Sequence, residues 1–214
     1  DRIEVASARV SEGEKEAVSM ICRYAEKIDK LDNVEVLGFV DGGVSVDWIV
    51  SCGAKVINLL AKGSLRHCRE QLGKSPEEHV EDICREVKYA RSKGLIVNLY
   101  LEDWSNGMKD SPEYVYQAMD VLCDIGIRRF MLPDTLGIMN PLQCIEYFRK
   151  MLKRYPDTHF DFHAHNDYDL AVSNSLAAAL SGAKGLHVTV NGLGERCGNA
   201  PLSSVQVILK DQFH

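Results

Sequence analysis

Residues 160–167 read FDFHAHND, and this segment decides how the rest of the chain is interpreted. Its first six residues alternate strictly between apolar and polar, which is typical of a β-strand with one buried face and one polar face. His163 and His165 share the polar face, with Cα atoms about 6.5–7 Å apart. Two imidazoles placed in this way can bind one divalent ion between them. The alternative is an ordinary pair of polar residues at a strand end, which is the more frequent meaning of an isolated His-x-His pattern.

A second segment favours the metal interpretation. Residues 191–201 read NGLGERCGNAP, a glycine-rich turn that follows the next predicted strand. Near its end, Asn199 offers a carboxamide oxygen as a ligand. A strand with one polar face is unusual in a parallel sheet unless that face lines a site. Imidazole, carboxamide and water ligands suit Mg²⁺, Mn²⁺ or Zn²⁺, and the residue types alone do not choose among these ions.

Strand-like apolar runs alternate with helical patterns along the whole chain, at about thirty residues per unit. Capping signals mark several helix starts, with Ser11 and Ser75 in S-x-x-E boxes and Ser111 and Asn140 directly before proline. The alternation predicts a parallel α/β sheet, either doubly wound or a TIM barrel. Seven strands are predicted, at residues 2–6, 34–40, 55–60, 95–101, 129–132, 159–163 and 185–190.

The polarity of the strand faces favours the barrel. Central strands of an open sheet are covered on both faces and should be apolar on both. Here Asn98, Tyr100 and Glu102 share one face of their strand, which fits a barrel with a site at the C-terminal ends of its strands. Because a (β/α)8 barrel needs eight strands, we expect a TIM-type barrel that lacks its first strand–helix unit. We expect residues 1–214 to form a single catalytic domain that holds strands 2–8.

Composition excludes several classes of protein. A chain of 214 residues with 45% hydrophobic and 26% charged residues can form one full core. A net charge of −6 without blocks of like charge argues against a nucleic-acid or anionic-membrane partner. No apolar run reaches the ~18 residues of a membrane span, and seven cysteines without C-x-x-C spacing indicate reduced thiols in a cytoplasmic protein. His67, His79 and His159 are expected to face solvent.

Five segments together resemble the DRE-TIM metallolyase superfamily, and the resemblance covers essentially the whole chain. The superfamily includes 2-isopropylmalate, homocitrate and citramalate synthases and hydroxymethylglutaryl-CoA lyase. The last two segments are highly specific when they occur together. The segments are IEVAS at 3–7, YLED at 100–103, LPDTLG at 132–137, HAHND at 163–167 and GLGERCGN at 192–199.

The chain looks most similar to citramalate synthase, through VLGFVDG at 36–42 and YLEDWSNG at 100–107. One departure is large. The first strand of the family carries an Arg-Asp-Gly or Arg-Glu motif, whose aspartate ligates the metal and whose arginine stabilises the oxyanion, and no such motif occurs here. The C-terminal segments of the synthases are missing as well. We therefore expect this sequence to be part of a longer protein, and residues 1–214 alone to be unable to turn over acetyl-CoA.

The resemblance implies a metal-dependent acyltransferase of amino-acid biosynthesis, of the isoleucine or leucine type. It would condense acetyl-CoA with a 2-oxo acid and hydrolyse the thioester to a 2-alkylmalate. His163, His165 and Asn199 would be the metal ligands. Glu102 would assist proton transfer or thioester hydrolysis, and its alternative is a salt-bridged barrel residue. Thr135 would hold the substrate carboxylate or, equally well, cap a turn.

The size of the substrate is predicted from strand parity together with the resemblance. Leu37, Leu60 and Tyr100 would face the alkyl group of the 2-oxo acid and leave little volume for it. Pyruvate, with one methyl group, is therefore the favoured substrate and citramalate the favoured product.

Three alternatives stay open. The chain can belong to a 2-isopropylmalate or homocitrate synthase, to a carbon–carbon lyase of the hydroxymethylglutaryl-CoA type, or to an inactive ligand-binding barrel. The lyases carry Gly-Gly-Cys-Pro in their glycine-rich loop, whereas Cys197 stands in Glu-Arg-Cys-Gly-Asn, so we expect no catalytic role for it. The expected partners are the two small-molecule substrates and a second copy of the chain in a homodimer, with no nucleic acid and no membrane.

Overall fold

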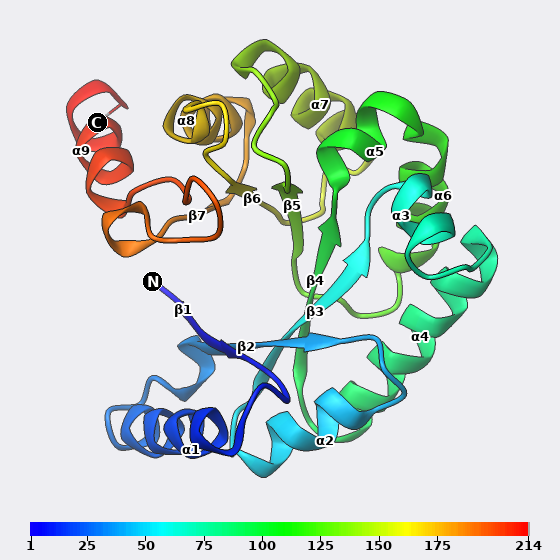
Figure 1. Ribbon diagram of the computed structural model, residues 1–214, viewed down its shortest axis with the longest axis vertical. Coiled ribbons are helices and arrows are strands. Elements are labelled where there is room, and N and C mark those ends of the chain that lie inside the picture. The colour runs from blue at the N-terminus through cyan, green and yellow to red at the C-terminus, as the bar shows by residue number, and fades with distance from the viewer. Residues whose placement is uncertain (214) are drawn as a thin grey trace. The chain divides into compact units, whose positions relative to one another are not determined.

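The computed structural model describes residues 1–213 and places seven strands in one sheet in chain order (Figure 1). A doubly wound sheet reverses its strand order at a switch point, and this sheet has no reversal. The β1–β2, β2–β3, β5–β6 and β6–β7 pairs are all parallel, which confirms the TIM-type α/β fold. The strands are β1 (Ile3–Ser7), β2 (Val34–Phe39), β3 (Val56–Lys62), β4 (Ile96–Glu102), β5 (Phe130–Asp134), β6 (Phe160–Ala164) and β7 (Gly185–His187).

Helices connect the strands, and their predicted starts are confirmed where caps were expected. Ser75 and Asn140 each accept a hydrogen bond from the backbone N–H three residues later, and each precedes a proline. Ser11 caps its helix in the same way. None of the described helices is both long and apolar enough to cross a membrane. The helices are α1 (Glu12–Lys27), α2 (Val44–Ser51), α3 (Leu65–Glu70), α4 (Pro76–Ser92), α5 (Trp104–Asp110), α6 (Pro112–Leu122), α7 (Pro141–Arg154), α8 (Ala171–Ser181) and α9 (Leu202–Phe213), with 3-10 turns η1 (Leu31–Asn33) and η2 (Val190–Gly192).

Contacts divide the chain into two compact units. The first unit consists of Asp1–Ala61, Cys68–Tyr100 and Tyr116–Arg128. The second consists of Lys62–His67, Leu101–Val115 and Arg129–His214. The last residues of β3 and β4 therefore belong to the same unit as β5, β6 and β7.

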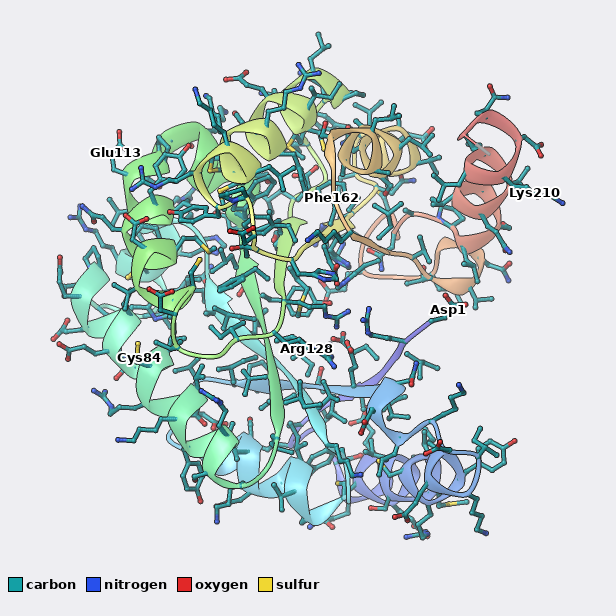
Figure 2. The ribbon with its side chains drawn as sticks, turned by 180° about the vertical axis from the view of Figure 1, so that it is seen from behind. Asp1, Cys84, Glu113, Arg128, Phe162 and Lys210 are labelled. Atoms are coloured by element: carbon teal, nitrogen blue, oxygen red, sulfur yellow. The ribbon has the colours of Figure 1, made fainter. Side chains whose placement is uncertain are left out.

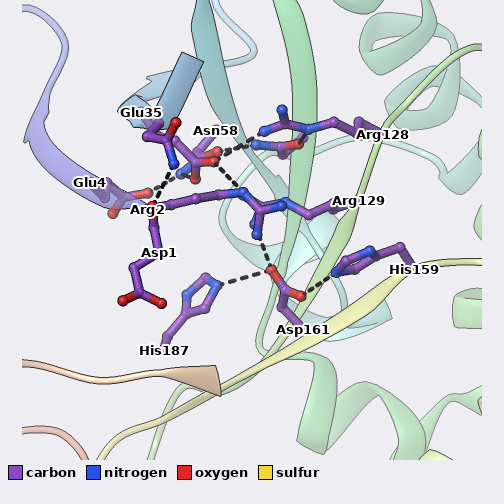
Figure 3. A network of polar contacts seen from close by, with 12 residues as sticks. Asp1, Arg2, Glu4, Glu35, Asn58, Arg128, Arg129, His159, Asp161 and His187 are labelled. Atoms are coloured by element: carbon purple, nitrogen blue, oxygen red, sulfur yellow. Dashed lines mark hydrogen bonds and ion pairs between the residues drawn. The ribbon is translucent and has the colours of Figure 1, made fainter. Parts of the chain in front are cut away.

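In the first unit, four side chains form a closed ring of hydrogen bonds on the polar strand face (Figure 3). Glu35 contacts Arg128 (Oε1–Nη2, 3.1 Å) and accepts from Asn58 Nδ2 (3.0 Å). Asn98 closes the ring, because its Nδ2 donates to Asn58 Oδ1 (2.7 Å) and its Oδ1 accepts from Arg128 Nε (3.0 Å). Glu35, Asn58 and Asn98 are all buried. The ring explains how this unit tolerates polar groups inside, since each is paired with another.

In the second unit, aromatic side chains hold β6 in place. Phe162 of β6, labelled in Figure 2, packs edge-to-face on Phe148 of α7, with ring centroids 5.6 Å apart. Phe148 in turn packs on Trp104 of α5, with ring centroids 5.5 Å apart. Phe160, Phe162 and Ala164 are fully buried. The predicted apolar face of this strand is therefore confirmed, and its burial turns Asp161 and His163 to the opposite face.

Strand boundaries differ from the prediction at the C-terminal ends. β3, β4 and β5 continue to Lys62, Glu102 and Asp134, one or two residues beyond the predicted ends. The pairing survives there because backbone hydrogen bonding does not depend on apolar side chains, as the Gly63 N–H donating to the Glu102 carbonyl shows (2.6 Å). β7 is shorter than predicted, since the chain turns into η2, where Asn191 has φ 57°.

The expectation that His67, His79 and His159 face solvent is wrong for His79, whereas the side chains of His67 and His159 are partly exposed, at 16% and 29%. His79 is 2% exposed inside the first unit. His67 and His159 each lie against a buried carboxylate of the second unit. The seven cysteines are free thiols, and four of them are buried.

Candidate metal centre

His163 and His165 lie together at the C-terminal end of β6. Their Nε2 atoms are 3.3 Å apart, and their ring planes are nearly perpendicular, at 83°. Two nitrogens that each lie about 2.1 Å from one ion are about 3.0–3.4 Å apart when the angle at the ion is about 90–110°. The pair therefore has the spacing of two ligands of a single metal ion.

Both imidazoles are held in the neutral form. Burial lowers the pKa of His163 well below its usual value, and the neighbouring His187 and His165 lower it further. Burial also lowers the pKa of His165, and the positive charge of Arg196 adds to the effect. A neutral imidazole is the form that binds a metal. At neutral pH both rings are therefore in the metal-binding state.

The backbone of Asn199 is paired with that of His165. It forms an isolated antiparallel bridge with His165, and its side chain is only 9% exposed. The Asn199 Nδ2 donates to the Leu193 carbonyl (3.3 Å), which leaves Oδ1 as an acceptor. Among the residues that the structure describes, none donates a hydrogen bond to this buried Oδ1. An unmatched buried acceptor costs about 1–3 kcal/mol, so Oδ1 fits the role of a cation ligand.

These three side chains fit part of a divalent metal site. Imidazole nitrogen with amide oxygen suits several divalent ions. Within residues 1–213, no group of three or more His, Cys, Asp or Glu side chains is arranged to hold a metal. The assignment of His163, His165 and Asn199 as ligands stays a prediction, and an ion on these three neutral groups would need further oxygen ligands from water or a bound anion.

Asp161 lies two residues before His163 on the same strand face and gathers cationic groups around it (Figure 3). Its carboxylate is 1% exposed and contacts Arg129 Nη1 (3.0 Å), His159 Nε2 (2.8 Å) and His187 Nε2 (3.5 Å). Burial acts to raise the pKa of Asp161, but the hydrogen bond and charge of His187, with the charges of Arg129 and His159, lower it overall. His187 in turn packs edge-on against His163, with ring centroids 5.6 Å apart. The ionised Asp161 therefore holds His187 against a candidate ligand.

Replacing Asp161 with asparagine should lower the free energy of unfolding by about 3 kcal/mol, because the buried Arg129 loses a carboxylate that offsets its charge. Urea unfolding of the metal-free protein at pH 7 measures this loss. The folded pKa of Asp161 is lowered, so its stabilisation is present above the unfolded pKa of about 3.9 and disappears as the pH falls through the folded value. The difference between parent and variant should therefore shrink below about pH 4.

The matched control for this prediction is Asp157→Asn, which changes an exposed carboxylate in the turn before β6. It should alter the free energy of unfolding by less than about 0.5 kcal/mol. Equal stability of the parent and Asp161→Asn at pH 7 would show that the Asp161 cluster contributes no net stability.

Glu102 ends β4 and pairs with Lys62, which ends β3. Lys62 is anchored through its own carbonyl, which accepts a hydrogen bond from the Tyr114 hydroxyl (3.1 Å). The ion pair agrees with the alternative interpretation of Glu102 as a salt-bridged barrel residue. It also holds the carboxylate in one position, which a catalytic acid or base requires. The catalytic role of Glu102 stays a prediction.

Asp103 follows Glu102, so alternation along β4 would place it on the outward face, opposite to Glu102; it is 1% exposed and forms the centre of a polar cluster. Its carboxylate accepts hydrogen bonds from Ser64 Oγ (2.7 Å) and Asn106 Nδ2 (2.8 Å) and lies 3.5 Å from His67 Nε2. Asp103 has φ 66° and so leaves the strand conformation, which places its carboxylate at the start of α5. In the sequence, the only signal for a special role of Asp103 is its place at the junction between β4 and α5.

Thr135 follows β5 and contacts two other loops of the second unit. Its hydroxyl oxygen accepts a hydrogen bond from the Asp103 N–H (2.8 Å), and its carbonyl accepts one from Arg196 Nη2 (2.8 Å). The hydroxyl still has its own proton to donate. A bond to a substrate carboxylate stays a prediction.

Leu37, Leu60 and Tyr100 belong to the first unit. Leu37 pairs in register with Asn58, and Leu60 follows Asn58 by two residues, so the two leucines share one face of the sheet. Tyr100 likewise follows Asn98, which is hydrogen-bonded to Asn58. The common face predicted for these residues is therefore confirmed, whereas their contact with a substrate stays a prediction.

The HMGL-like family model matches residues 1–213. This chain belongs to the HMGL-like family. This chain is 35% identical over 211 residues to a curated relative, a 2-isopropylmalate synthase of Sulfolobus acidocaldarius. The match covers 98% of this chain and 53% of the relative. This chain is 33% identical over 211 residues to an (R)-citramalate synthase of Methanocaldococcus jannaschii, covering 98% and 41%. The chain therefore spans about half the length, or less, of these relatives.

A crystal structure of the HMG-CoA lyase from Brucella melitensis is similar to this HMGL-like chain, with a TM-score of 0.81 over 99% of this chain and 78% of the other. At 18% identity this likeness supports the TIM-type fold alone. Together with the family match, the comparisons confirm the resemblance to the DRE-TIM superfamily.

Proposed function

We propose that the protein is a metal-dependent acyltransferase that condenses acetyl-CoA with a 2-oxo acid and hydrolyses the thioester to a 2-alkylmalate. The observation that carries this proposal is the neutral pair of His163 and His165, together with a backbone bridge from His165 to Asn199, whose Oδ1 is buried and unmatched. The relatives named 2-isopropylmalate synthase and citramalate synthase support the same class of product. The expected homodimer, and the cytoplasmic location expected from the cysteines, belong to the same proposal.

A divalent ion on this ligand set would polarise the carbonyl of the 2-oxo acid. The remaining work falls to side chains at the strand ends. Glu102, held by Lys62, would take a proton from the acetyl methyl group or from the water that hydrolyses the thioester. Thr135 would donate its hydroxyl proton to the substrate carboxylate, because its oxygen already accepts from the Asp103 N–H.

We further propose that the 2-oxo acid is pyruvate. Leu37 and Leu60 are half-buried on the face that also carries the buried Tyr100, and this supports our proposal that three bulky side chains limit the size of the alkyl group. A hydrophobic pocket gains only about 1–3 kcal/mol per methylene and selects mainly by excluding larger groups. The second carboxylate of 2-oxoglutarate would be buried beside leucines without a partner.

The test is release of CoA from acetyl-CoA by the metal-loaded full-length protein, with pyruvate and with 2-oxoisovalerate. We expect kcat/KM to be at least about tenfold higher for pyruvate, because the isopropyl group adds two methyl groups to a closed pocket. A higher value for 2-oxoisovalerate would show that the leucines do not close the pocket and would make 2-isopropylmalate the product. Absence of CoA release with every 2-oxo acid, under conditions where hydroxymethylglutaryl-CoA is cleaved, would overturn the synthase and favour a lyase.

A further inference from the structure

We propose that Arg196 and Asp167 form a clamp that positions Asn199 as a metal ligand. This inference rests on the proposed metal-dependent function, and it assigns both residues as positioning residues that need not touch the ion. Three observations carry it: the contacts of the guanidinium, the conformation of the loop between Arg196 and Asn199, and the packing of Asp167 against the loop after β5.

The Arg196 guanidinium joins three separate segments of the second unit. Its Nε and Nη2 donate to the two carboxylate oxygens of Asp167, at 2.8 and 2.9 Å, and Nη2 also donates to the Thr135 carbonyl at 2.8 Å. Two parallel hydrogen bonds fix the plane of a guanidinium as well as its position. The clamp therefore ties the glycine-rich loop to the segments that follow β5 and β6.

Partial exposure argues that the clamp has a role other than stabilising the fold. The side chains of Arg196 and Asp167 are 39% and 21% exposed, and ion pairs at such exposure contribute little to global stability. A bidentate geometry with a third hydrogen bond is more than such a surface pair needs. We therefore infer that the Arg196–Asp167 pair serves to fix the position of the glycine-rich loop.

The loop between Arg196 and Asn199 is tightly packed, so the position of Asn199 depends on that of Arg196. The Gly198 N–H donates to the Glu195 carbonyl and the Asn199 N–H to the Gly192 carbonyl, both at 2.9 Å. A Cβ added to Gly198 would lie 2.2 Å from the Gly192 oxygen, so the loop segments around Gly192 and Gly198 are in close contact. A Cβ at Gly194 would likewise meet the Asn199 carboxamide at 2.5 Å. A shift of Arg196 must therefore move the Asn199 side chain.

The other side of the clamp is fixed to the candidate histidine ligands. Asp167 follows His165 by two residues, and the Asn166 N–H between them donates to the Gly198 carbonyl (2.9 Å). Gly137, in the loop after β5, approaches so closely that an added Cβ would lie 2.6 Å from the Asp167 carboxylate. The clamp thus sets where Asn199 Oδ1 lies relative to the His165 ring.

The experiment measures the Kd for Zn²⁺ of the metal-free full-length protein by competition with a chelator. Arg196→Lys keeps the charge but loses the bidentate geometry, and Asp167→Asn keeps the shape but loses the charge. Each variant should bind Zn²⁺ about 10-fold or more weakly, as is usual for residues that orient ligands. The double variant should lose little beyond either single one, because both remove the same contact. Thermal unfolding midpoints without metal should stay within a few degrees of the parent, which a purely stabilising role would not allow.

Arg149→Lys, which changes an exposed arginine on α7, is the matched control and should leave the Kd unchanged. Parent-like Zn²⁺ affinity in both single variants would overturn the clamp and leave the proposed function standing. Independent, additive losses in the double variant would also overturn it, since Arg196 and Asp167 would then act separately. A parent protein that binds no Zn²⁺, Mn²⁺ or Mg²⁺ would instead overturn the proposed function itself.

Discussion

Replacing His163 with alanine should weaken Zn²⁺ binding by the full-length protein by more than about 100-fold, and CoA release should fall with it. Changes to residues that merely orient ligands cost about 10–100-fold, and loss of one of two imidazoles should cost more. The fold should survive, because the buried face of β6 is formed by Phe160, Phe162 and Ala164. Chelator competition with the purified variant gives the Kd directly.

The matched control is His159→Ala, which removes an imidazole that directly precedes the same strand. His159 contacts Asp161 and lies away from the His163–His165 pair in sequence, so the Kd should stay within about threefold of the parent. Parent-like Zn²⁺ affinity in both His163→Ala and His165→Ala would refute the ligand assignment.

Replacing Glu102 with glutamine should lower kcat by about 10²–10⁴-fold, the usual contribution of a positioned acid or base, without weakening metal binding. Glutamine keeps the length and shape of the side chain but cannot take up a proton at neutral pH. The measurements are kcat for CoA release with pyruvate and the Kd for Zn²⁺ of the same preparation. A parallel loss of metal would place Glu102 in the metal site instead.

Glu113→Gln on α6, an exposed position, is the control and should leave both quantities unchanged. Unchanged turnover in Glu102→Gln would mean that the ion pair with Lys62 is the whole role of this carboxylate.

The features that the sequence predicted well are those that depend on local periodicity. Alternation in residues 160–165 predicts both the buried face of β6 and the shared direction of His163 and His165, and the structure has both. Alternation says nothing once the backbone leaves the strand conformation. Asp103, with φ 66°, has a buried carboxylate whose hydrogen bonds with Ser64 and Asn106 the alternation did not predict.

The sequence also could not predict which polar groups pair with one another over long distances along the chain. A polar strand face predicts either a site or a set of groups that satisfy one another, and the same residues fit both. Glu35, Asn58 and Asn98 form a closed ring with Arg128, whereas His163 faces His165 and His187. The burial of His79, at 2% exposed, likewise depends on packing that alternation does not predict.

The most direct test of the metal centre is a crystal structure of the full-length protein with bound Zn²⁺ or Mn²⁺, with the ion located by its anomalous scattering. We expect one ion about 2.0–2.2 Å from Nε2 of His163 and Nε2 of His165, with Asn199 Oδ1 also bound. An ion bound elsewhere, with the two Nε2 atoms still in contact with each other, would contradict this expectation.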